Sequence, residues 1–83
     1  MPHDDLIYEI EDRIAKAKAR FGNFASTHEA LGVALEEWDE FRDAIRSNDF
    51  AQVEHEAIDL AAVLIRIARD IRNGESTRAR STK

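Results

Sequence analysis

The sequence contains no cysteine, so it forms no disulfide and offers no thiolate as a metal ligand or nucleophile. It also lacks an apolar run of the roughly 18 to 20 residues that a membrane-spanning helix needs. Its first residues, 1–5, do not have the basic and then apolar character of a signal peptide. These absences predict a cytoplasmic protein that has no membrane partner.

Basic residues are also in short supply. Lys and Arg number 12 against 17 Asp and Glu, which gives a formal net charge of -5. A protein that binds duplex nucleic acid usually carries a basic stripe, so duplex nucleic acid is not an expected partner. The segment 75–83 is rich in Ser, Thr and Arg and has no large apolar side chain. It is predicted to be a disordered basic tail that follows a single domain over 1–74.

Proline occurs only once, and no segment alternates apolar and polar residues as a strand would. Apolar residues instead recur every three or four positions, which is the period of amphipathic helices. This pattern predicts helices over about 5–21, 26–46 and 50–73. Residues typical of helix ends lie at these boundaries: Gly22 as a left-handed stop, Ser26 with Glu29 as a capping box, Asn48 or Asp49 as the cap of the third helix, and Gly74 as its end.

The third predicted helix has the widest apolar surface, which covers well over half of its circumference. Its apolar residues are Val53, Ala57, Ile58, Leu60, Ala61, Ala62, Val63, Leu64, Ile65, Ile67, Ala68 and Ile71. Such a helix lies in the middle of a bundle or packs against a second subunit. The second helix has a narrower stripe centred near Trp38, which is predicted to lie in the core. Because a chain of 83 residues is close to the size at which one core gives marginal stability, we predict an all-α bundle of three helices that is completed by dimerisation.

Carboxylates form two short patterns on the second and third helices. Residues three apart on a helix share one face, so Glu37 pairs with Glu40, and Glu56 pairs with Asp59. Carboxylates that converge repel one another, and a hard cation with oxygen ligands, Mg²⁺ or Mn²⁺, would offset their charge.

Glu56 is the most unusual of these acids, because it interrupts the apolar face of its helix. A carboxylate in such a position costs several kcal/mol if it stays unpaired. The alternative to a metal is an ordinary buried ion pair between Glu56 and either Arg66 or Lys16.

These acids resemble the signature of the MazG-like all-α nucleoside triphosphate pyrophosphatases. That signature has Glu-Glu-x-x-Glu on one helix and Glu-x-x-Asp on the next, and it is matched here by Glu36, Glu37, Glu40, Glu56 and Asp59. The likeness covers about 21–71, and the segments 27–30 and 61–66 are similar to short phage and bacterial members. The resemblance implies a helical homodimer or dimer of dimers that binds Mg²⁺. It also implies an enzyme that hydrolyses a nucleoside triphosphate between its α- and β-phosphates, releasing a nucleoside monophosphate and pyrophosphate.

Carried over by position, the resemblance implies that the metal ligands are Glu37, Glu40, Glu56 and Asp59. Glu36 would be the catalytic base that activates water, or a group behind the ligands. A helical projection at about 100° per residue turns Glu36 away from the ligands. Its role therefore depends on a rotation of the helix or on a second subunit.

The chain differs from larger family members, because it has no fourth helix and no segment rich in Lys or Arg within the domain. The candidate substrate-binding residues are Lys16, Arg20, Asn23, His28 and Arg66. Phe24 and Trp38 are further candidates for stacking on a nucleobase, with a place in the core as the favoured interpretation of Trp38. For each basic residue, a solvated surface charge is the alternative. The alternative function is a non-catalytic helical interaction or oligomerisation module, or a degenerate family member.

Overall fold

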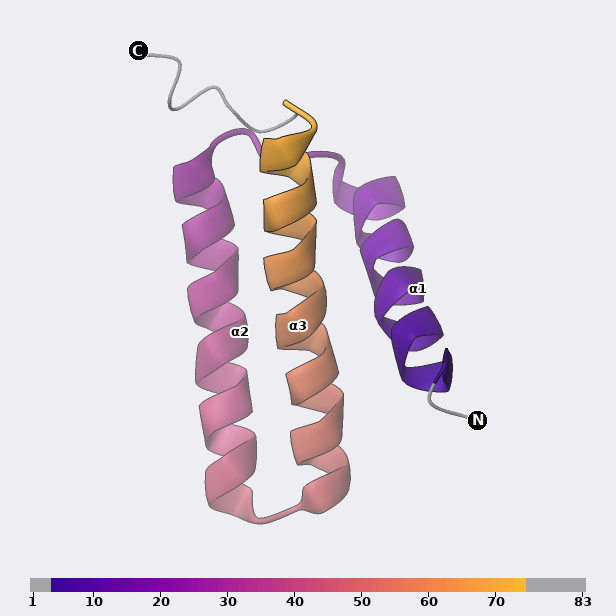
Figure 1. Ribbon diagram of the computed structural model, residues 1–83. Helices are drawn as coiled ribbons and strands as arrows, with labels where there is room; N and C mark the ends of the chain where they lie inside the picture. Colours follow the sequence, from indigo (N-terminus) through magenta and orange to yellow (C-terminus); the bar gives the residue numbers. More distant parts are fainter. Residues whose placement is uncertain (1–3, 75–83) are drawn as a thin grey trace.

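The computed structural model describes residues 4–74, which form three helices: α1 (Asp4–Phe21), α2 (Thr27–Ser47) and α3 (Phe50–Arg72) (Figure 1). The predicted all-α class is confirmed, and each helix begins and ends within one residue of its predicted position. None of the described helices is both long and apolar enough to cross a membrane. The predicted basic tail, 75–83, lies outside the described residues.

Short-range signals define the connection between α1 and α2. Gly22 adopts a φ of 75°, and its amide donates to the carbonyl of Lys18 at 2.9 Å, as a left-handed helix stop requires. Ser26 caps α2 by accepting from the amide of Glu29 at 3.2 Å. The Glu29 carboxylate accepts from the amide of Ala25 at 2.6 Å, one residue before the expected partner. The predicted capping box is therefore present in a shifted form.

The turn between α2 and α3 contains only Asn48 and Asp49. Asn48 has a φ of 63° and ends α2, while Asp49 caps α3 by accepting from the amide of Gln52 at 3.2 Å. Of the two residues predicted as possible caps of α3, Asp49 has that role. A turn this short makes α2 and α3 antiparallel neighbours, and Figure 1 shows the hairpin that results.

The helix α3 lies between the other two, with α2 on one side and α1 on the other (Figure 1). Its predicted central position is confirmed. The core is small, and half of its apolar members are alanines: the buried apolar residues are Ile14, Phe24, Ala30, Ala44, Ile58 and Ala62. Such a core gives limited stability to a single copy of the chain.

The prediction that Trp38 belongs to the core is wrong. Its side chain is 47% exposed and packs against Phe41, with ring centroids 5.8 Å apart. The apolar stripe of α2 is wider than the surface that α3 covers, so part of it faces outward. The large apolar residues of α2 and α3 that remain exposed are Leu31, Leu35, Trp38, Ile45, Phe50, Leu64 and Ile71.

Candidate metal centre and groove

Three carboxylates converge where α2 packs against α3. Glu37 and Glu40 extend from α2 and Glu56 from α3, and one carboxylate oxygen of each lies within 4.8 Å of the others. The i, i+3 spacing brings the first two to one face of α2, and the tight hairpin brings that face against Glu56. Glu56 is buried, Glu37 is half-buried and Glu40 is exposed. We call these residues the carboxylate trio.

Two oxygens of the trio have no hydrogen-bond partner among the described residues. They are Oε1 of Glu37 and Oε1 of Glu56, and both are buried. The second oxygen of Glu56 accepts from the side-chain amide of Gln52 at 2.8 Å. Buried carboxylate oxygens almost always have a partner. A cation bound between these two oxygens would give each of them one.

The alternative ion pairs expected for Glu56 do not form. Lys16 instead pairs with Asp12 at 3.0 Å, one helical turn away on the surface of α1. Arg66 donates to the backbone carbonyl of Gly22, and its guanidinium lies 3.9 Å from the ring centroid of Phe24. The interpretation of Glu56 as half of a buried ion pair with either residue is therefore wrong.

The crowding of negative charge raises the pKa values of two members of the trio. Burial and the charges of Glu40, Asp59 and Glu56 raise the pKa of Glu37 to about 7. Burial and the neighbouring Glu56 also raise the pKa of Glu40. Near neutral pH, Glu37 therefore holds a proton for part of the time, and a bound cation would replace that proton.

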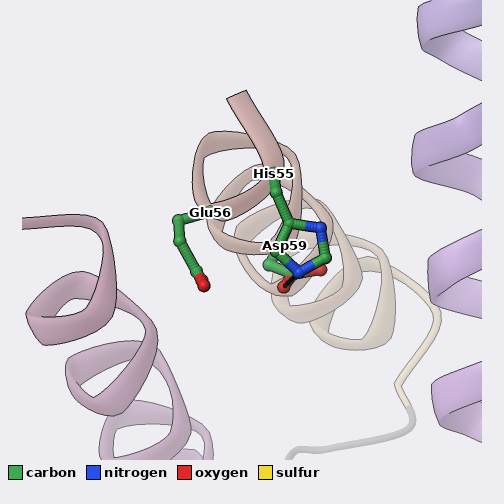
Figure 2. A group of neighbouring side chains, drawn as sticks. All are labelled: His55, Glu56 and Asp59. Atoms are coloured by element: carbon green, nitrogen blue, oxygen red, sulfur yellow. Dashed lines mark ion pairs between the residues drawn. The ribbon is translucent and has the colours of Figure 1, made fainter. Parts of the chain in front are cut away.

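Asp59, the fourth predicted ligand, is a neighbour of Glu56 on α3 but turns its carboxylate toward α1 rather than toward α2. Figure 2 shows Glu56 on the side that faces α2, and His55 with Asp59 on the side nearer to α1. Asp59 accepts from Nη1 of Arg13 at 2.6 Å, and its other oxygen lies 3.4 Å from Nε2 of His55. His55, Glu56 and Asp59 form a second group whose ligand atoms lie within 4.8 Å of one another. The structure therefore brings three of the predicted ligands together and leaves Asp59 beside them, paired with Arg13.

A groove of about 660 Å³ runs beside these acids, between α1 and α2 and over α3. Its size is in the range of small-molecule binding sites. Its acidic lining residues are Glu29, Glu36, Glu37 and Asp59, and its basic ones are Arg13, Arg20 and Arg66. The apolar and aromatic part includes Val33, Ala62, Val63, Phe21 and Phe24. The groove can therefore offer cation ligands, positive charges and an apolar surface to one ligand.

The predicted site residues divide according to this groove. Arg20, Asn23 and Arg66 line it, whereas Lys16 and His28 are exposed and do not line it. Glu36 is exposed, as its position on the helical projection indicates, and it also lines the groove beside Glu37. The helical projection described α2 only. The groove also has a wall formed by α1, so Glu36 faces a surface that a projection of α2 does not include.

The sequence analysis missed Arg13, which joins α1 to α3 and lines the groove. One signal was available: Arg13 lies between Ile10 and Ile14, beside the apolar stripe of α1. A charged residue at the edge of such a stripe often pairs with the neighbouring helix. Phe24, a candidate for stacking on a nucleobase, is buried beneath Arg66, so its ring is covered.

Comparison with known proteins gives no relative, since no protein-family model, curated protein or solved structure matches the chain. The resemblance to MazG-like pyrophosphatases therefore stays a prediction that depends on the five acids of the signature. Any assignment of function has to be argued from the carboxylate trio and the groove.

Proposed function

We propose that the chain is a metal-dependent nucleoside triphosphate pyrophosphohydrolase of the MazG-like type, acting in the cytoplasm. It would cleave a ribo- or deoxyribonucleoside triphosphate between the α- and β-phosphates to a monophosphate and pyrophosphate. The observation that carries the proposal is the pair of buried, unpartnered oxygens on Glu37 and Glu56, next to the carboxylate of Glu40. An all-oxygen set of this charge suits Mg²⁺ or Mn²⁺.

The residues present fit such a cation. Glu37, Glu40 and Glu56 would hold it, and Asp59 is the nearest further carboxylate on α3. A bound divalent cation supplies neutralisation of phosphate charge and a lower pKa for an attacking water. One oxygen each of Glu37 and Glu56 is buried between the two helices, which keeps these oxygens close together before a cation arrives.

The groove provides the other roles that the reaction requires. Glu36 is an exposed carboxylate on the groove wall, where it would accept a proton from the attacking water. Arg20 and Arg66 would offset the charge of the phosphates, and Asn23 would donate or accept a hydrogen bond. Lys16 and His28 have no part in the proposal, because they do not line the groove.

We propose that the chain works as a homodimer, or as a dimer of dimers, built through the outer face of α2 and α3. Leu31, Leu35 and Trp38 recur at helical spacing on one side of α2 and stay about half exposed. At about 100° per residue, Glu36 points to the opposite side of α2 from Trp38. A second copy of the chain that packs on this apolar face would therefore bury the face itself and leave the groove, which lies on the other side of α2, open.

The activity is tested by incubating the protein with a panel of canonical and modified nucleoside triphosphates plus Mg²⁺ or Mn²⁺ and assaying pyrophosphate. We expect turnover of at least one substrate. Glu56→Gln should lower the activity roughly 100-fold or more, because removing a metal ligand should reduce activity at least as much as removing a group that only orients a ligand. Glu54→Gln is the matched control, since Glu54 is an exposed carboxylate on the same helix. Absence of turnover across the panel would contradict the proposal and favour the non-catalytic interaction module.

The dimer is tested separately by sedimentation equilibrium at micromolar concentration. One chain has a mass of 9.5 kDa, and we expect twice that value or a higher even multiple. Trp38→Glu should shift the mass toward that of a single chain, because a charge would have to be buried at the interface. A wild-type mass of one chain would contradict the dimer without bearing on the activity.

A further inference from the structure

We propose that Arg13 is an internal counter-ion that occupies Asp59 in the cation-free protein and releases it when a divalent cation binds the carboxylate trio. The inference rests on the proposed metal centre and adds a residue that the family signature does not include. Its starting observation is the ion pair itself: Nη1 of Arg13 lies 2.6 Å from Oδ1 of Asp59, and both side chains are partly buried, at 22% and 27% exposed. Arg13 and Asp59 both line the groove.

Asp59 lies where its carboxylate can pair either with Arg13 or with a cation bound to the carboxylate trio. It follows Glu56 by three residues on α3, so the two side chains share neighbouring directions on the helix, and their oxygens lie within 4.8 Å of each other with a nitrogen of His55. A rotation about the side-chain bonds of Asp59 would turn its carboxylate from α1 toward Glu56. A cation held by the trio therefore competes with Arg13 for the same carboxylate.

Arg13 can release Asp59 without losing all of its partners. Its Nη2 donates to the carboxylate of Glu9 at 3.1 Å, and its Nη1 also donates to the backbone carbonyl of His55 at 3.1 Å. These contacts would keep the guanidinium at the wall of the groove after the exchange. The N–H of Nη1 that is freed would then face the space next to the cation, where it can donate to an anionic oxygen such as that of a phosphate.

A second ion pair across the same helix interface provides a matched control. Arg69 donates to both oxygens of Glu11, each at 2.7 Å, and so also joins α3 to α1. Arg69 does not line the groove, and neither Arg69 nor Glu11 belongs to a carboxylate group around the candidate centre. Replacing Arg69 or Arg13 by glutamine changes the net charge equally, so a difference between the two variants reports on position.

The test is the dissociation constant for Mn²⁺ alone, measured by isothermal titration calorimetry on wild type, Arg13→Gln, Arg69→Gln, Asp59→Asn and the Arg13→Gln/Asp59→Asn double variant. We expect Arg13→Gln to bind Mn²⁺ about tenfold more tightly than Arg69→Gln does, and the gain to disappear when Asp59 is already neutral. Equal affinities for Arg13→Gln and Arg69→Gln would overturn the inference. So would a gain that persists in the Asp59→Asn background, because Arg13 would then act only as a distant charge.

A second measurement uses the unmodified protein and so does not depend on how a variant folds. In protein labelled with ¹⁵N-arginine, the Nε–Hε signal of Arg13 should move during a Mg²⁺ titration with the midpoint of binding, while that of Arg69 stays in place. A signal of Arg13 that does not respond to bound Mg²⁺ would overturn the inference and leave the metal centre intact. No binding of Mn²⁺ or Mg²⁺ by either wild type or Arg13→Gln would overturn both.

Discussion

The two surfaces that α3 presents to its neighbours differ in the charges that face them. Toward α1, each acid meets a base: Asp59 meets Arg13, and Asp70 meets Lys18 at 3.0 Å. Toward α2, Glu56 meets only further acids, Glu37 and Glu40. The first interface can be electrostatically satisfied by the chain itself, whereas the second leaves two carboxylate oxygens without a partner. Within α3, the side that faces α2, where only acids meet, is therefore the side that an external cation would stabilise.

Glu56 and Asp70 show the same difference at single positions. Both are buried carboxylates of α3, at 8% and 1% exposed. Asp70 accepts from Lys18, so its charge contributes to the packing of α1. Glu56 accepts from the neutral Gln52 and keeps one oxygen unpartnered. A buried acid with a base at hand has a structural role, and one without a base is the better candidate for ligand binding.

The largest expected effect tests the paired interface. Asp70→Asn should lower the free energy of unfolding by about 2 to 3 kcal/mol, because a charged hydrogen bond in a buried place is replaced by a neutral one. Asp12→Asn is the control, since Asp12 pairs with Lys16 on the exposed surface of α1. That variant should change the free energy by less than about 0.5 kcal/mol. Urea denaturation followed by circular dichroism measures both, and equal effects would contradict a structural role for Asp70.

A second prediction addresses the like-charged interface through pH. The pKa of Glu37 is raised from 4.5 to about 7 in the folded protein, so folding favours its protonated form. Stability from this group is therefore full below pH 4.5 and is lost as the pH rises toward 7. We expect a loss of about 1 to 2 kcal/mol, because solvent screens part of the interaction at a half-buried group.

The measurement is the free energy of unfolding of the metal-free protein, in EDTA, across that pH range. Glu37→Gln should reduce this loss of stability between pH 4.5 and 7, because glutamine does not titrate. Saturating Mn²⁺ should reverse the slope, since the cation binds the deprotonated carboxylates. A pH profile of wild type that matches that of Glu37→Gln would show that the trio is not strained by its own charge.

Much of this architecture follows from local sequence signals. The helix boundaries were predicted because Gly22, Ser26 and Asp49 act within a few residues of their own positions. Three of the four carboxylates that were predicted to converge do so, because the short hairpin brings the Glu37 and Glu40 pair of α2 against Glu56 of α3. Neither prediction required knowledge of how distant segments pack.

The remaining features depend on packing that no local pattern specifies. Arg13 and Asp59 are separated by 46 positions, and their contact depends on which face of α1 meets α3. The groove depends on the same choice. Trp38 was placed wrongly because an apolar stripe shows that a surface is apolar, and it does not show whether the same chain covers that surface.

The smallest expected effect concerns Arg69 and Glu11, the exposed ion pair of the α1 interface. The hydrogen bond from Arg69 lowers the pKa of Glu11, so its contribution is present above about pH 4.5 and is lost as the pH falls. Arg69→Gln should lower the thermal midpoint slightly in dilute buffer, and the difference from wild type should vanish in 1 M NaCl, where charges are screened within about 3 Å. The difference for Asp70→Asn should persist in the same salt, because a buried pair is screened much less. If both differences vanish in 1 M NaCl, the ion pairs between α1 and α3 both act as surface charges. The α1-facing and α2-facing sides of α3 would then differ only in how exposed their charges are.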